Sequence, residues 1–385
     1  MPTASSRTSR YDWRNGSSPA TCCFGSTPVK SCARASAAMP SAGCRGLPGR
    51  DHTRPDLGME APLSAVFVTE VSSVTAPMLA SWVNSGHRIA AVVVPGPRAG
   101  KRLSFGVLRR RLRRRFVLKV HLGRTMPRLI EFGSPYDWNA IDPQIGAIGA
   151  DLLICFGYGK LIPQTALELF PNGGLNLHPA LLPHYRGPHP IHRLVIDQMH
   201  EAHGGVTLHR MTSGFDEGDI LAQVRFAAED WHSAATVNWA LAHAMAVLVA
   251  DMAPDFCRGS LAGLPQPDET YGWARVGRDP LIVDRQSSSE YVARLCRIVA
   301  SSVSISVLID GKPIRLAQPV RRLGPPTGKE ARRRWGLVEF DCADARVIYL
   351  AYNKLSRLLT RWRWRRLWSR QEPRSFEIRR FGAKD

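Results

Sequence analysis

Several features are absent or scarce in this 385-residue chain, and each narrows what the protein can be. No run of about 18 consecutive apolar residues occurs, so we expect no membrane-spanning segment and no membrane partner. No C-x-x-C pair occurs among the eight cysteines: Cys22, Cys23, Cys32, Cys44, Cys155, Cys257, Cys296 and Cys342. Several of them lie inside apolar patterns, as Cys155 does in DLLICFG, so we expect reduced, buried thiols in a cytoplasmic protein.

Acidic residues are also scarce, with 32 Asp and Glu against 52 Lys and Arg. The resulting net charge of +20 indicates a polyanionic partner or a solubilising surface, and it says nothing about the fold. The length and the apolar content are sufficient for two domains with sizeable cores.

The first 60 residues are rich in Ser, Ala, Gly, Pro and Arg, and they have no hydrophobic periodicity. Such a segment buries too little apolar surface to offset the entropy of ordering, so we expect it to be disordered. An organellar transit peptide and an over-long gene start, with translation beginning at Met59, both fit this composition.

From Ser64 onward, apolar strands alternate with amphipathic helices. The segments SAVFVT, HRIAAVVVP, DLLICFGYG and GLNLH are expected to be strands, and GVTLHRM and DILAQVRFA a later pair. This alternation predicts an α/β fold with a parallel, Rossmann-like sheet, whose chemistry gathers at the carboxyl ends of the strands.

The C-terminal part has a different pattern. VSISVLIDGKPIRLAQPVRRL alternates with period 2 around a DGK turn, and WGLVEFD and RVIYLAY add further strands, which favours a small OB-like β-barrel. The domains expected are an extension at 1–60, a catalytic domain at 61–257, a linker at 258–275, the barrel at 276–360 and a basic tail at 361–385.

Asn176 and His178 lie two positions apart on one predicted strand, so their side chains share a face. Each would cost roughly 1–3 kcal/mol if it were buried without a partner. An isolated N-x-H is more often a satisfied core histidine than a site. With an Asp nearby, however, an Asn can stabilise an oxyanion and a His can move a proton. That combination suits direct acyl transfer between amines.

The surroundings of this strand favour the site. GLNLHPALLPHYRG, GVTLHRM and GFDEGDI, in this order and spacing, resemble the formyltransferase family that takes its formyl group from 10-formyltetrahydrofolate. DLLICFGYGKLIP resembles the pterin-side segment of that family. The resemblance covers about Ser64 to Pro254 and is densest between Asp151 and Gln223.

The resemblance implies specific roles. Asn176, His178 and Asp216 would be the catalytic trio, and 10-formyltetrahydrofolate would be the co-substrate, with no metal ion. The implied folate pocket is lined by Lys160, Leu161, Ile162, Thr212 and Phe215. Arg186 and Gly187 would shape the acceptor side.

The sequence leaves the acceptor amine open. The basic stretch around Arg113 and Arg114 resembles the basic loop with which tRNA-acting members approach the acceptor stem, and favours initiator tRNA charged with methionine. The stretch VTEVSSV lacks the Gly-Thr-Pro turn usual in those members, which favours a small amine such as an amino sugar nucleotide. A non-catalytic RNA-binding relative is the third alternative. We expect a monomer.

Overall fold

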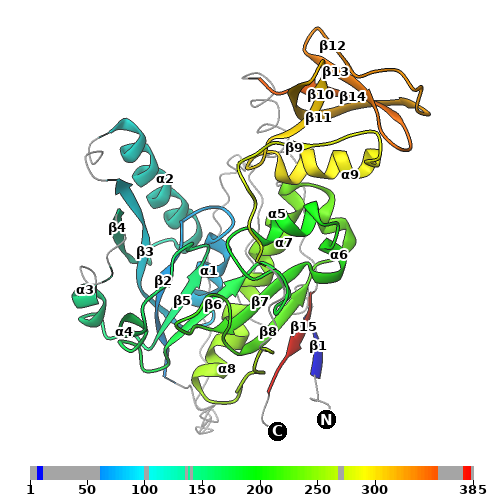
Figure 1. Cartoon of the computed structure of the whole chain (residues 1–385). Coiled ribbons are helices and arrows are strands. Elements are labelled where there is room, and N and C mark those ends of the chain that lie inside the picture. Colours follow the sequence, from blue (N-terminus) through cyan, green and yellow to red (C-terminus); the bar gives the residue numbers. More distant parts are fainter. Residues whose placement is uncertain are drawn as a thin grey trace, which may run out of the picture. The chain divides into compact units, whose positions relative to one another are not determined.

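A nine-stranded mixed sheet joins strands between residues 64 and 225 to two further strands at residues 7–11 and 376–380 (Figure 1). The computed structural model describes residues 7–11, 61–98, 104–134, 138, 142–267, 273–353 and 376–382. The strand order is β1-β15-β8-β7-β6-β5-β2-β3-β4. The strands are β1 (Arg7–Tyr11), β2 (Ser64–Val68), β3 (Arg88–Arg98), β4 (Arg128–Ser134), β5 (Leu152–Phe156), β6 (Gly174–His178), β7 (Gly205–Arg210), β8 (Ile220–Arg225) and β15 (Phe376–Arg380).

The five strands from β4 to β6 run parallel, as the sequence pattern predicted. Residues 64–68 and 152–155 are fully buried, which suits Val-, Ile- and Leu-rich strands covered on both faces. Strands β7, β8, β15 and β1 continue the sheet in antiparallel fashion beyond β6. His178 therefore ends a strand that has a parallel neighbour on one side and an antiparallel one on the other.

Helices follow the strands and cover the sheet. They are α1 (Ala76–Asn84), α2 (Phe105–Leu122), α3 (Asp142–Gly146), α4 (Gln164–Leu167), α5 (Pro190–Ile196), α6 (His200–His203), the 3₁₀-helix η2 (Ala228–His232), α7 (Ala234–Val247), the π-helical turn η3 (Leu248–Met252) and α8 (Ala253–Cys257). Helix α7 begins at Ser233, whose hydroxyl accepts a hydrogen bond from the Thr236 amide.

The continuous helix Ala234–Cys257 is long and apolar enough to cross a membrane, although the sequence was expected to contain no such segment. Within the fold 72% of its most apolar window is buried. Its side chains pack into the main core with α1 and the sheet, as in a core helix.

The basic stretch that the sequence suggested to be a loop is the 18-residue helix α2. Ser104 caps it by accepting from the Val107 amide, and Gly123 ends it with a φ of 61°. Leu, Arg and Lys are strong helix formers, so local propensity and a proper cap account for the helix.

A second sheet follows, with the order β12-β13-β14-β11-β10-β9. It contains β9 (Leu281–Ile282), β10 (Ile305–Ile309), β11 (Lys312–Gly324), β12 (Arg332–Arg334), β13 (Leu337–Asp341) and β14 (Arg346–Ala351), with α9 (Ser289–Arg294) and the π-helical turn η4 (Leu295–Val299) packed beside it. The predicted DGK hairpin is confirmed, since Asp310 and Gly311 both have positive φ, as a tight turn requires. In the described residues β9 and β12 are the two edges, so closure into an OB-like barrel stays a prediction.

Two segments expected to lie outside the domains contribute strands to the main sheet. Strand β15, from the expected basic tail, pairs with β8, and β1, from the expected disordered extension, pairs with β15 (Figure 1). The expectation is therefore wrong for residues 7–11 and 376–380. The apolar alternation in Phe376-Glu-Ile378 is too short to stand out in sequence, yet both apolar side chains are buried. Residues 12–60 and 354–375 lie outside the described ranges.

Candidate active site

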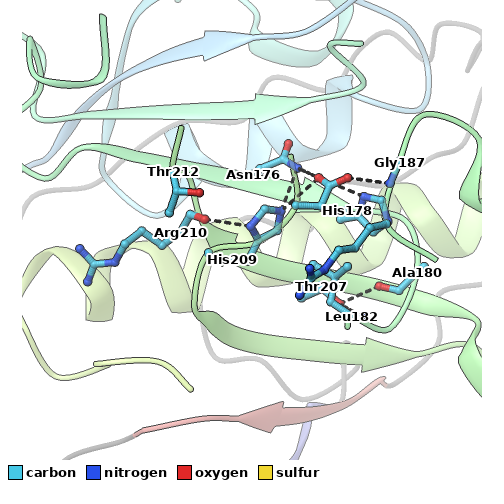
Figure 2. A network of polar contacts seen from close by, with 12 residues as sticks. Asn176, His178, Ala180, Leu182, Gly187, Thr207, His209, Arg210 and Thr212 are labelled. Carbon is cyan, nitrogen blue, oxygen red and sulfur yellow. Dashed lines mark hydrogen bonds and ion pairs between the residues drawn. The ribbon is translucent and has the colours of Figure 1, made fainter. Parts of the chain in front are cut away.

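Asn176, His178 and Asp216 lie together, as the sequence predicted. Figure 2 shows Asn176 and His178 within one network of polar contacts. Strand β6 presents Asn176 and His178 on one face, and the loop between β7 and β8 brings Asp216 to them. Asp216 Oδ1 accepts a hydrogen bond from Asn176 Nδ2 at 3.2 Å and lies 3.4 Å from His178 Nδ1. One carboxylate thus contacts both polar side chains of the strand, which supplies the partner that their burial demands.

The His178 ring is buried and held on both nitrogens. Its Nε2 lies 2.9 Å from the carbonyl oxygen of Tyr185 and therefore donates to it, because a carbonyl oxygen can only accept. Tyr185 has a φ of 59°, in the left-handed region that non-glycine residues seldom occupy. The loop after β6 thus adopts a strained conformation that directs this carbonyl at the ring.

His209 is a member of the site that sequence reasoning missed. It is the cross-strand partner of Asn176 on β7, and its Nε2 lies 3.0 Å from Asn176 Nδ2. Its Nδ1 donates to the carbonyl of Arg210, and its Nε2 faces both Asn176 Nδ2 and, at 3.6 Å, Asp216 Oδ1. The signal in the sequence was the histidine of GVTLHRM, which is His209. When this strand pairs antiparallel with GLNLH, His209 lies opposite Asn176.

Asp216 is the electrostatic centre of the site. Burial alone would raise the pKa of its carboxyl, but the charge of His178 and hydrogen bonds from His178 and His209 outweigh burial and hold the pKa well below its ordinary range. Its φ of 55° is again left-handed. Asp216 therefore remains ionised at neutral pH, with its backbone bent to bring the carboxylate to β6.

The loop from Pro179 to Gly187 is braced from β7 and β8. Thr207 donates to the Ala180 carbonyl and accepts from the Leu182 amide, while Gln223 donates to the Leu182 carbonyl. The Leu182–Pro183 bond is cis. A small apolar cluster joins Leu182 and Ile220 to Phe381, which follows β15, so the returning C-terminal strand supports this loop.

Gly187 occupies a position that only glycine fits. Its φ is 113°, and a Cβ there would meet the Trp273 ring at 3.0 Å. Its amide donates to Asp216 Oδ2 at 2.9 Å. The glycine thus permits both this backbone conformation and the close approach of Trp273.

Replacing Gly187 with Ala should lower the free energy of unfolding by about 1–3 kcal/mol through backbone strain. It should also reduce turnover, because the displaced amide no longer holds Asp216. Thermal melting and initial rates check this. Gly173→Ala is the matched control, since Gly173 has a φ of 67° with nothing within 4 Å of the added Cβ. Equal losses of rate for both variants would contradict the role given to Gly187.

Gln266 is a second residue that sequence reasoning missed, because it lies in the expected linker. Its Oε1 accepts from Arg186 Nη2 at 2.8 Å, and its Nε2 donates to the carbonyls of Asp216 and Gly218 at 2.9 and 2.7 Å. This one side chain ties the acceptor-side loop to the Asp216 loop. It acts on the trio only through those loops.

Replacing Gln266 with Ala should lower turnover roughly ten-fold, because small displacements of positioning groups are costly in rate. Gln266→Glu keeps the acceptor for Arg186 and loses both donors to the Asp216 loop. A loss of rate in Gln266→Glu as large as that in Gln266→Ala would assign the effect to the Asp216 loop. Unchanged rates in both would show that the bridge is only structural.

The residues predicted to hold the folate lie on two loops near the trio. Lys160 and Leu161 are exposed on the loop after β5, whereas Ile162 is buried in the second core cluster, so its side chain packs rather than binds. Thr212 and Phe215 lie on the β7–β8 loop, and the Phe215 ring contacts Trp273 edge to face.

A cavity of about 790 Å³ lies beside the start of β6, between α4 and α8. Its wall includes Thr212 and Gly174 but none of the trio. This cavity and the convergent polar groups are therefore neighbours, and the chemistry is assigned to the polar groups because they carry the titratable contacts.

The two arginines predicted to bind the acceptor differ in environment. Arg113 is exposed on α2. Arg114 is buried, donates to Glu70 through Nε at 2.8 Å and also donates to the Pro95 carbonyl. The assignment of Arg114 to the acceptor is therefore wrong, since its guanidinium anchors α2 to the sheet. Consecutive residues of an α-helix point about 100° apart, so Arg114 can face the sheet while Arg113 faces solvent.

Cys155, the strand partner of Asn176, is the thiol nearest the trio in the β5–β6 pair. Burial raises the pKa of this thiol to about 12, which keeps it protonated and unreactive. His178 is buried, and Asn176 and Asp216 are partly buried beside this inert thiol. In this α/β domain the three side chains offer a donor, a proton carrier and an orienting anion, a set that suits acyl transfer.

Comparison with known proteins specifies the class further. Residues 134–249 match the family model described as formyl transferase. It is 32% identical over 184 residues to a methionyl-tRNA formyltransferase of Paraburkholderia phymatum, which covers 47% of this chain and 56% of that protein. The corresponding enzyme of Burkholderia thailandensis is 34% identical over 177 residues, covering 44% and 53%. The chain thus spans little more than half of the relatives that it matches.

Among solved structures, an N-formyltransferase of Helicobacter canadensis, crystallised with folinic acid and dTDP-3-aminofucose, superposes with a TM-score of 0.50. It is 12% identical and covers 76% of this chain and 100% of that one. At this identity the likeness supports the α/β formyltransferase fold and nothing finer.

Proposed function

We propose that this chain transfers the formyl group of 10-formyltetrahydrofolate to an amine. The observation that carries the proposal is the Asp216 carboxylate in contact with both Asn176 and His178. The amine nitrogen attacks the formyl carbon while the unprotonated form of His178 takes the amine proton. The bond from that carbon to the folate nitrogen then breaks as His178 passes this proton to the folate nitrogen. Asn176 donates to the oxygen that becomes negative in the tetrahedral intermediate, and Asp216 orients the imidazole.

The folate would lie between the loop after β5 and the β7–β8 loop. Lys160, Leu161 and the backbone at Ile162 would form one wall, and Thr212 and Phe215 the other. Both loops end beside the trio, at the carboxyl edge of the parallel strands where α/β sheets place their ligands.

For the acceptor we propose the amino group of methionyl initiator tRNA. The names of the relatives support this, as does exposed positive charge at Arg113 on α2 and at Arg333 and Arg334 on β12. Phosphate contacts by such side chains make affinity fall steeply with salt. The C-terminal sheet would act as part of an OB-like barrel in a cytoplasmic monomer.

The alternative acceptor is an amino sugar nucleotide or another small amine. The Helicobacter enzyme is matched over its whole length, whereas the tRNA enzymes are matched over little more than half. The absence of a Gly-Thr-Pro turn after the first strand also favours this alternative.

Formyl transfer from labelled 10-formyltetrahydrofolate to charged initiator tRNA, measured beside a panel of amino sugar nucleotides, decides between the acceptors. Transfer to neither kind of amine would contradict the proposed function altogether.

Arg113 and Arg114 supply a matched pair for the tRNA acceptor. Arg113→Gln should raise KM for tRNA and lower the salt slope by about 0.9 for one phosphate contact. Arg114→Gln should lower the melting temperature and leave the slope unchanged. The reverse pattern would contradict the assignment.

A further inference from the structure

Helix α2 presents two opposite faces, and the one turned away from the sheet is apolar. Arg114, Leu118 and Leu122 are buried against the sheet and α1. On the other face five large apolar side chains are 55–80% exposed: Phe105, Leu108, Leu112, Phe116 and Val120. Their spacing of three or four residues aligns them in one stripe, which we call the α2 stripe. Single exposed apolar residues are ordinary, but an aligned row of five marks an interaction surface.

The flanks of the α2 stripe are uniformly basic. At 100° per residue, Arg109 and Arg113 lie along one flank and Arg115 and Lys119 along the other, and all four are exposed. The sequence from 104 to 130 contains no Asp or Glu. The acids that reach α2 are Glu70 and Glu131, which pair with Arg114 and Arg111 on the side of the sheet. The occupant of the stripe must therefore be apolar in the middle and anionic on both sides.

Three occupants offer negative charge, but their apolar surfaces differ. RNA presents phosphates and no apolar layer that would bury Leu and Val. An acidic protein would need an apolar groove with acidic residues on both rims, in register with the helix. An anionic lipid surface offers headgroup phosphates above hydrocarbon at every point, and matches a stripe built from Phe, Leu and Val between Arg and Lys.

We propose that α2 docks the protein onto an anionic lipid surface, with the α2 stripe in the interface and the four flanking cations at the headgroups. The helix is about 27 Å long and charged along both sides, so it lies in the plane of the interface and does not span it. This revises the expectation of no membrane partner, which rested on the absence of a long apolar run. An interfacial helix needs no such run.

The inference is independent of the acceptor amine. Arg113 could contact tRNA phosphates in solution, as proposed above. The apolar side chains of the α2 stripe bind no phosphate, so tRNA binding does not account for them.

Sedimentation of the full chain with vesicles tests the proposal. The chain should bind vesicles of phosphatidylcholine containing phosphatidylglycerol, and should bind vesicles of phosphatidylcholine alone much more weakly. Binding should fall as salt rises, because each cation near such a surface contributes about five-fold in affinity. Equal binding to both kinds of vesicle, or binding to neither, would overturn the proposal.

Variants separate the stripe from general surface stickiness. Leu112→Ala with Phe116→Ala should weaken vesicle binding about ten-fold or more. Val320→Ala with Leu323→Ala is the control, since these side chains are also exposed but lie on β11, and its vesicle binding should not change. Formyl transfer in solution should be the same in both double variants, which also shows that they fold. If Leu112→Ala with Phe116→Ala leaves vesicle binding intact, or weakens tRNA binding instead, the stripe is not a lipid-docking surface.

Discussion

Replacing His178 with Ala should lower the rate of formyl transfer by about 10²–10⁴-fold, and replacing Asn176 with Ala by about 10²–10³-fold. Both side chains act on charge that develops only as the amine attacks, so the loss should appear in kcat rather than in KM for the folate. Single-turnover transfer from 10-formyltetrahydrofolate, with either acceptor, measures it.

His209→Asn is the informative control for these variants. His209 reaches the trio through Asn176 and Asp216 and lies on the neighbouring strand, so its loss should cost less than that of His178. Near-parental rates in His178→Ala would refute the mechanism. A larger loss in His209→Asn would transfer the proton-carrying role to His209.

Replacing Asp216 with Asn should impair both folding stability and turnover. The carboxylate accepts from the Asn176 side chain and from the Gly187 amide, and it faces His178. The Asn side chain of the variant has one oxygen that accepts hydrogen bonds and an NH₂ group that only donates. This NH₂ group must therefore face one of the donors that now face a carboxylate oxygen. Leaving buried donors unpaired costs about 1–3 kcal/mol each. We expect a loss of about 2–4 kcal/mol in unfolding free energy and at least about 100-fold in rate.

The pH dependence of that stability difference has a definite sign. The folded-state pKa of Asp216 lies below its unfolded value, so its stabilising contribution is fully present above about pH 4. The contribution disappears as pH falls toward the folded-state pKa, because the folded protein must then take up the same proton. Chemical denaturation of parent and Asp216→Asn from neutral to acidic pH should show the two curves converging. A constant difference down to the lowest pH reached would contradict the depressed pKa.

Sequence patterns predicted the central strands and the trio because both depend on short-range rules. Buried parallel strands are continuous apolar runs, and Asn176 and His178 share a face by strand alternation alone. Gln266 and Trp273 escaped prediction because their roles come from tertiary contacts with loops about 50 to 90 positions away, and no local pattern encodes such contacts. Arg113 and Arg114 look alike in sequence, and only the packing of α2 on the sheet distinguishes them. The strand at 376–380 was missed because two apolar residues in five carry little signal without a partner strand.

The return of β15 to the main sheet has a consequence for the order in which the protein becomes competent during synthesis. The chain separating Arg380 from Asp255, its ion-pair partner in the first domain, is 125 residues long. Until that stretch has left the ribosome, β8 is an open edge, and Leu182 and Ile220 lack the cover of Phe381. A sheet finished by so distant a strand closes late and slowly, because the entropy of a long loop must be overcome first. Nascent chains halted before residue 376 should therefore bind chaperones at this edge and acquire activity only after the last strand is released.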